Sequence, residues 1–120
     1  MNWEAVLSED DLPRGAKRVA MVGGTEVLLV NHAGVIHAVA NRCPHLQAKL
    51  VKGEVTEDGA IVCPRHHSVF DLQTGSVREW VPWPPLVGRA LGALSSEEVL
   101  NVYPTRVENG SIWVATGDPE

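Results

Sequence analysis

Residues 18–40 read RVAMVGGTEVLLVNHAGVIHAVA, in which short apolar runs alternate with turn residues. The runs cover residues 18–22, 26–30 and 35–40, and they are separated by a Gly-Gly pair and by an Asn-His-Ala-Gly segment. Apolar runs of this length, rich in valine and bounded by glycine or asparagine, are typical of β-strands joined by turns. The segment therefore predicts a meander of three strands.

Strand signals continue toward the C-terminus, where apolar segments at residues 61–62 and 70–72 each lie close to a glycine. Asn109-Gly110 lies between two further apolar segments and is the strongest two-residue hairpin signal in the chain. Helix signals are few. Ser8–Asp11 has the pattern of a capping box that Pro13 cuts short, and residues 95–98 favour a turn or two. We expect an all-β protein.

The chain has the length and composition of one folded domain. It contains 120 residues, of which 44% are hydrophobic and 21% charged, and this composition excludes a largely disordered chain. We expect a single domain over residues 1–120, because this length is typical of one domain. A membrane-spanning helix would need roughly 20 consecutive apolar residues, and the sequence has no such stretch. We therefore expect no membrane partner.

The charge balance bears on partners and location. The formal net charge of −5 argues against nucleic acid and against an anionic membrane surface as partners. Residues 41–71 are neutral, with four basic and four acidic side chains, so the acidity lies in the flanking parts. The first ten residues carry three acids and no base, unlike the basic start of a secretion signal. These features predict a cytoplasmic protein.

A proline-rich stretch does not fit the strand pattern. Residues 80–94 begin with Trp-Val-Pro-Trp-Pro-Pro-Leu, and the three prolines exclude both a helix and a central strand. The tryptophans fit either a surface loop that covers the core or a docking surface stiffened by proline. The sequence leaves both roles open.

Two short segments each combine one cysteine with one histidine: Cys43-Pro44-His45 and Cys63-Pro64-Arg65-His66. Seventeen residues separate them, and each follows a predicted strand. A cytosolic protein keeps its thiols reduced, so a metal site is favoured over a disulfide. Zinc would accept two cysteines and two histidines, but zinc fingers usually group cysteine with cysteine. The interleaved order favours two irons, with the cysteines on one and the histidines on the other, and zinc stays the alternative.

These motifs resemble those of the soluble Rieske ferredoxins. The resemblance rests on Cys43–Leu46, on Gly53 and Gly59 in the intervening segment, and on the run CPRHHSVFDLQTG at residues 63–75. Weaker similarity covers most of the remaining chain. The resemblance implies a Rieske fold, which is an antiparallel β-sandwich with a small inserted cluster-binding subdomain, here at about residues 41–75.

The resemblance also implies one Rieske-type 2Fe-2S cluster and its ligands. Cys43 and Cys63 correspond to the residues that hold the inner iron. His45 and His66 correspond to those that hold the outer iron, near the tip of the protein. The four residues are therefore the expected metal and cofactor ligands.

The other three histidines are not expected to bind the metal. His67 occupies a position that is usually glycine in the family, and the two-residue spacing from Cys63 favours His66 as the ligand. His32 lies in a predicted turn and His37 in a predicted strand, where solvated or core roles are far commoner than ligation.

Residues next to the expected ligands bear on the reduction potential. Rieske centres lie at about −150 to +300 mV, because two neutral imidazoles replace two thiolates. The resemblance places Ser68 at the position of a serine that bonds a cluster sulfur. It places Phe70 where high-potential members have a tyrosine, and Pro64 stiffens the turn after Cys63. We expect a potential in the lower half of the range, raised somewhat by Ser68.

The function implied by the resemblance is one-electron transport, with no substrate chemistry of its own. The expected partners are redox proteins, namely a ferredoxin reductase as donor and a dioxygenase-type oxygenase or similar acceptor. A terminal oxygenase would need a mononuclear iron site in a large further domain, for which this length leaves no room. Two alternatives stay open: the Rieske small subunit of a nitrite reductase, and a zinc-stabilised interaction module.

Overall fold

The computed structural model describes residues 2–42, 49–64, 67–79 and 100–116, which form antiparallel β-sheets. One sheet has the order β1 (Asn2–Ser8), β10 (Ser111–Thr116), β9 (Thr105–Glu108). A second has the order β2 (Lys17–Val22), β3 (Thr25–His32), β4 (Val35–Ala40), β8 (Val102–Tyr103). A third has the order β5 (Ala60–Val62), β6 (Val69–Asp71), β7 (Val77–Glu79). Short 3₁₀ helices are η1 (Glu9–Asp11) and η2 (Leu50–Lys52), and the prediction of an all-β protein is confirmed.

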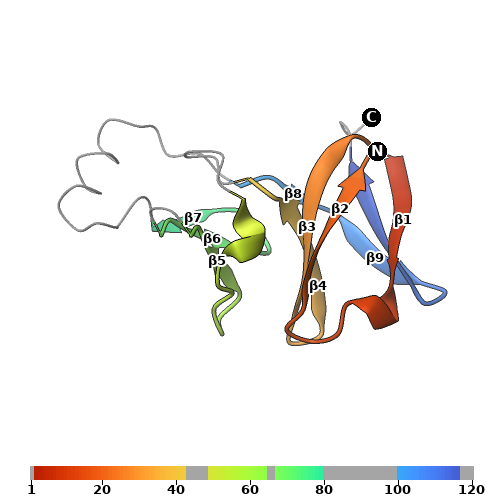
Figure 1. The fold of residues 1–120 in the computed structure, drawn as a ribbon, viewed down its shortest axis with the longest axis horizontal. Coiled ribbons are helices and arrows are strands. Elements are labelled where there is room, and N and C mark those ends of the chain that lie inside the picture. Colours follow the sequence, from red (N-terminus) through yellow and green to blue (C-terminus); the bar gives the residue numbers. More distant parts are fainter. Residues whose placement is uncertain (1, 43–48, 65–66, 80–99, 117–120) are drawn as a thin grey trace.

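The three sheets form layers, with the four-stranded sheet in the middle (Figure 1). The packing of strand β3 explains why its central residues 27–30 are all apolar. Leu28 and Val30 belong to the core shared with the β5-β6-β7 sheet, whereas Val27 and Leu29 belong to the core shared with the β1-β10-β9 sheet. Successive side chains of a strand point to opposite faces, so a strand that is covered on both faces reads as an unbroken apolar run.

Tight two-residue turns connect the strands of the meander and the two strands of the C-terminal hairpin. Gly23-Gly24 joins β2 to β3, Ala33-Gly34 joins β3 to β4, and Asn109-Gly110 joins β9 to β10. All six of these residues have positive φ, the conformation of the type I′ turns that match the twist of a hairpin. The second turn is shorter than the sequence suggested, because β3 continues to His32, which pairs with Val35.

The prediction of a capping box at Ser8 is wrong, because the side-chain hydrogen bond that defines such a box is not formed. Helix η1 is a single 3₁₀ turn, and Ser8 makes no side-chain hydrogen bond to cap it. Ser8 is the last residue of β1 and pairs with Ser111, and the next backbone N–H, that of Glu9, donates to Gly110 O at 2.8 Å. The strand ladder therefore takes the position that a helix cap would occupy. The predicted turn at residues 95–98 and the proline-rich stretch 80–94 lie outside the described residues.

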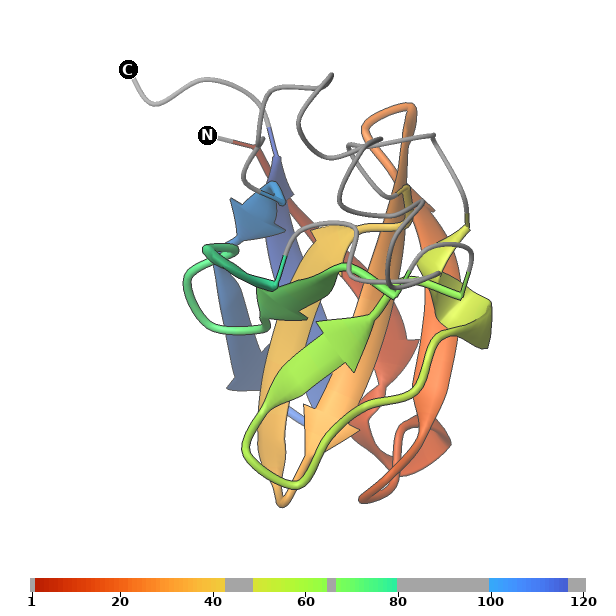
Figure 2. The ribbon, with the colours of Figure 1, turned by 90° about the vertical axis from the view of Figure 1, so that its left-hand side faces the viewer.

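The β5-β6-β7 sheet and η2 cover one face of the middle sheet, as Figure 2 shows from that side. Their shared core includes Leu50, Ile61 and Phe70, all fully buried. The boundaries expected from the sequence, about residues 41–75 for the subdomain and 1–120 for a single domain, stay predictions. Among the described residues, the structure has no helix long and apolar enough to cross a membrane.

Candidate metal centre

The second Cys-His segment connects β5 to β6. Cys63 follows β5 directly and is buried, with 3% of its surface exposed. Its backbone N–H donates to Ser68 O at 2.8 Å, and its carbonyl accepts from the N–H of His67 at 3.1 Å. These two bonds extend the β5-β6 ladder, so they close the base of the loop that holds Pro64 and His66. The two bonds therefore fix the backbone position of Cys63.

His67 has a backbone conformation that few side chains adopt. Its φ is 62°, in the left-handed region, and its residue is exposed. A residue other than glycine in this region costs roughly 1–2 kcal/mol. Glycine adopts this φ without that cost, which agrees with the expectation that family members carry glycine at this position. The role of His67 stays a prediction.

The three residues that were expected to surround the ligands lie beside Cys63. Ser68 is buried, Phe70 is fully buried in β6 opposite Ile61, and Pro64 is exposed. Phe70 and Cys63 belong to the same apolar core. The thiol of Cys63 is therefore held at the edge of a packed core, away from bulk water.

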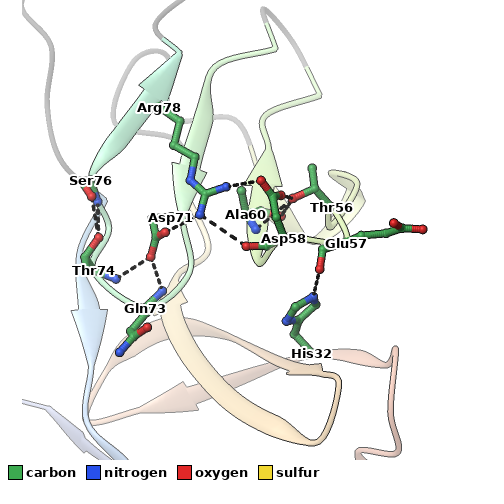
Figure 3. A network of polar contacts seen from close by, with 10 residues as sticks. All are labelled: His32, Thr56, Glu57, Asp58, Ala60, Asp71, Gln73, Thr74, Ser76 and Arg78. Carbon is green, nitrogen blue, oxygen red and sulfur yellow. Dashed lines mark hydrogen bonds and ion pairs between the residues drawn. The ribbon is translucent and has the colours of Figure 1, made fainter.

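Arg78 connects the turn that precedes β5 to the last residue of β6 (Figure 3). Its guanidinium donates to Asp71 Oδ2 at 2.6 Å and to Asp58 Oδ2 at 2.8 Å. The bond from Arg78 holds the pKa of Asp71 below its usual value, and the N–H groups of Gln73 and Thr74, which donate to Asp71 Oδ1, act in the same direction. Asp71 is thus an ionised anchor at the end of β6 that lies away from the loop.

His32 and His37, which the sequence analysis did not expect to bind metal, lie where the middle sheet meets the segment before β5. His32 Nε2 is 2.9 Å from Glu57 O, a hydrogen bond between the middle sheet and the turn after η2 (Figure 3). His37 is partly buried, and desolvation, followed by repulsion from His32, lowers its pKa. With Asp58 and Asp71 they line a cavity of about 210 Å³. Both are half-buried, between the solvated and the core roles that the sequence indicated.

The first Cys-His segment lies outside the described residues, so Cys43 and His45 have no described position, and neither does His66. The residues that flank this segment are described. Asn41 is buried with 2% exposure, and its side-chain Oδ1 accepts from the backbone N–H of Val51 at 2.8 Å. The sequence analysis missed Asn41, although a polar residue directly after an apolar strand and two residues before Cys43 was a usable signal.

The one expected ligand that the structure describes, Cys63, fits an iron-sulfur cluster. Cys63 supplies a buried soft sulfur, and thiolate with imidazole is a ligand combination that suits iron-sulfur chemistry. Within the part of the chain that the structure describes, no three His, Cys, Asp or Glu side chains converge as a metal site. Three of the four expected ligands lie outside that part, so Cys63 is the expected ligand that the structure positions.

Similarity to known proteins extends over most of the chain. The ferredoxin component of the alkene monooxygenase system of Xanthobacter autotrophicus is 34% identical over 111 residues, which cover 92% of this chain and 79% of that protein. The ferredoxin subunit of 3-phenylpropionate/cinnamic acid dioxygenase of Escherichia coli is 29% identical over 87% of this chain and 84% of its own length.

A solved structure has the same fold along its whole length. The ferredoxin of carbazole 1,9a-dioxygenase from Nocardioides aromaticivorans superimposes with a TM-score of 0.77 at 25% identity, covering 98% of this chain and all of the other. The family model described as "Rieske [2Fe-2S] domain" matches residues 2–104. The chain therefore belongs to the Rieske [2Fe-2S] domain family, and its cofactor is one Rieske-type 2Fe-2S cluster.

Proposed function

We propose that the protein is a one-electron carrier whose cluster is held by Cys43 and Cys63 on one iron and by His45 and His66 on the other. The observation that carries the proposal is the setting of Cys63, whose thiol is buried and whose backbone is closed onto Ser68 and His67. The position of Cys63 after a short strand agrees with the motif that the family match covers.

When bound, such a cluster accepts and releases one electron at a potential set by its ligands and surroundings. The protein's part is to hold the ligands still and to control the access of water. Cys63 and Phe70 lie in one apolar core, which limits solvation on that side of the site. Ser68 directly precedes β6, is buried, and accepts the backbone N–H of Cys63 at its carbonyl. A hydrogen bond from its hydroxyl to a cluster sulfur is part of the proposal.

The proposed partners are a reductase that supplies the electron and an oxygenase that accepts it. Two relatives are described as ferredoxin parts of a monooxygenase and of a dioxygenase system, respectively. This favours a carrier over a nitrite reductase subunit, and the protein itself would perform no substrate chemistry. A cytoplasmic location belongs to the proposal, because thiolate ligands stay reduced there.

A redox titration of the purified protein tests the function. We expect one electron per chain and a midpoint in the lower half of the range of about −150 to +300 mV. The physical reason is that Phe70 has no hydroxyl to donate toward the site, while Ser68 does. A midpoint near +300 mV would contradict the assignment of Phe70, and the absence of reversible reduction would contradict the carrier function.

A further inference from the structure

Asn41 is a buried polar residue at the point where the chain leaves β4. It is 2% exposed. Its backbone N–H donates to Glu26 O at 3.2 Å, which extends the β3-β4 ladder by one pair beyond Val27 and Ala40. Its side-chain amide uses both ends, because Nδ2 donates to Glu26 Oε2 at 2.8 Å and Oδ1 accepts from Val51 N at 2.8 Å.

These contacts connect the two ends of the first Cys-His segment. The N–H of Leu50 reaches Asn41 O at 3.4 Å, so Leu50 and Val51, which follow residues 43–48, both donate to Asn41, which precedes them. A loop whose ends are tied has fewer conformations to lose when its side chains bind a ligand. The second segment has a corresponding closure in the bond from Cys63 N to Ser68 O.

The side chain at position 41 has to serve as a hydrogen-bond donor to Glu26 and as an acceptor for Val51 N–H. Glu26 Oε2 accepts from Asn41 Nδ2 and also from Lys49 Nζ, at 2.5 Å. The hydrogen bond from Lys49, and then that from Asn41, lowers the pKa of Glu26, so the carboxylate is ionised at neutral pH. An ionised carboxylate accepts but cannot donate, and its partner at 41 must therefore be a donor. The Val51 N–H requires an acceptor from the same side chain. Asparagine meets both requirements.

We propose that Asn41 is a positioning residue for the cluster, and that it fastens the ends of the segment carrying Cys43 and His45 to Glu26. The inference rests on the proposed ligand role of these two residues. Asn41 itself touches neither iron nor sulfide in this account. It acts by setting where the chain enters and leaves the ligand segment, in the way that residues behind metal ligands tune affinity in other proteins.

Charge exchange between positions 26 and 41 tests the proposal. Asn41→Asp keeps the shape and the acceptor for Val51 N, but it sets a second carboxylate against Glu26. Glu26→Gln alone keeps an acceptor for Asn41 Nδ2 but removes the charge that pairs with Lys49, so it serves as the reference for the double variant. In the double variant Asn41→Asp/Glu26→Gln, the new amide at 26 can donate to the new carboxylate at 41. The double variant also has the net charge of the wild type.

Asn31 is the matched control. It is a second buried asparagine, at the other end of β3, where Nδ2 donates to Leu12 O at 2.8 Å and Oδ1 accepts from Gly34 N at 2.9 Å. Asn31→Asp turns a carboxylate oxygen toward a carbonyl oxygen, so it should lower fold stability as Asn41→Asp does. Neither of these two side-chain bonds reaches a residue that flanks 43–48, so cluster retention should stay as in the wild type.

The measurement is iron and sulfide per chain together with the rate at which a chelator bleaches the visible absorbance, on folded protein. We expect Asn41→Asp to bleach about 10–100-fold faster than the wild type. The double variant should bleach at close to the rate of Glu26→Gln, and Asn31→Asp should bleach at close to the wild-type rate. Recovery in the double variant separates a specific contact from a general loss of stability.

Three outcomes overturn the inference. If Asn41→Asp and Asn31→Asp bleach at the same rate, or if Glu26→Gln fails to restore the double variant, Asn41 has no positioning role and the proposed function is unaffected. If the wild type itself contains neither iron nor sulfide, the proposed function fails and the inference fails with it. The wild-type iron content therefore tells the two failures apart.

Discussion

Gly75→Ala is expected to lower the free energy of unfolding by more than about 3 kcal/mol, because two separate penalties apply. A Cβ atom at this position would lie 1.9 Å from Leu100 O, a backbone atom that cannot rotate away. The Gly75 carbonyl also accepts from Leu100 N at 2.8 Å, so moving the chains apart would break that bond. In addition, φ is 76°, which disfavours any L side chain.

Gly110→Ala separates the cost of the positive φ from the cost of the steric clash. Gly110 has a similar φ of 78°, but a Cβ atom there would meet nothing within 4 Å. The control variant should therefore lose only the backbone part, about 1–2 kcal/mol. Urea denaturation of both variants measures the difference. Equal losses in the two variants would show that the close approach of residues 75 and 100 does not hold in solution.

Cys63→Ser is expected to remove the cluster almost completely. Serine keeps the size of the side chain and the bond from the backbone N–H to Ser68 O, so the β5-β6 hairpin should persist. A neutral hydroxyl is a far poorer iron ligand than a thiolate, because soft sulfur ligands favour iron-sulfur clusters. His66→Ala should also lose the cluster. Iron content per chain and the visible absorbance measure both effects.

His67→Gly is the control for these ligand variants. Glycine suits the left-handed φ of 62°, so the loop should keep its shape and the cluster should be retained. A chain that loses its cluster in His67→Gly but keeps it in His66→Ala would reverse the choice between the two adjacent histidines. Retention of the cluster in Cys63→Ser would remove Cys63 from the ligand set.

The strands of the meander could be predicted from the sequence to within two residues, because apolar runs alternate with turn residues. The run in β3 is buried on both faces of the middle sheet, whereas β2 leaves Val19 and Met21 exposed. Strand β1 was missed. Its first four residues are exposed, so the sequence carries no alternation to indicate a strand. It forms because it pairs with β10, and Arg106 lies 4.6 Å from the ring centroid of Trp3 and 5.5 Å from that of Trp113. Such pairing depends on tertiary structure.

In the candidate site too, the sequence indicated the residue in a local motif but not the residue whose partners are distant in the chain. Cysteine and histidine spacing indicated Cys63, and the structure buries this residue at the hydrogen-bonded base of its loop. The spacing gave no information about Asn41, since its partners Glu26 and Val51 lie 15 and 10 residues away in the chain. The false capping box at Ser8 has the same origin, because a local motif was overridden by pairing with a distant strand.

Iron and acid-labile sulfide analysis of the anaerobically purified protein tests the central claim most directly. The account predicts about two irons and two sulfides per chain, with a paramagnetic signal that develops when one electron is added. A colourless protein with about one zinc ion per chain and no sulfide would contradict it, since a tetrahedral zinc site uses the same residue types without redox chemistry.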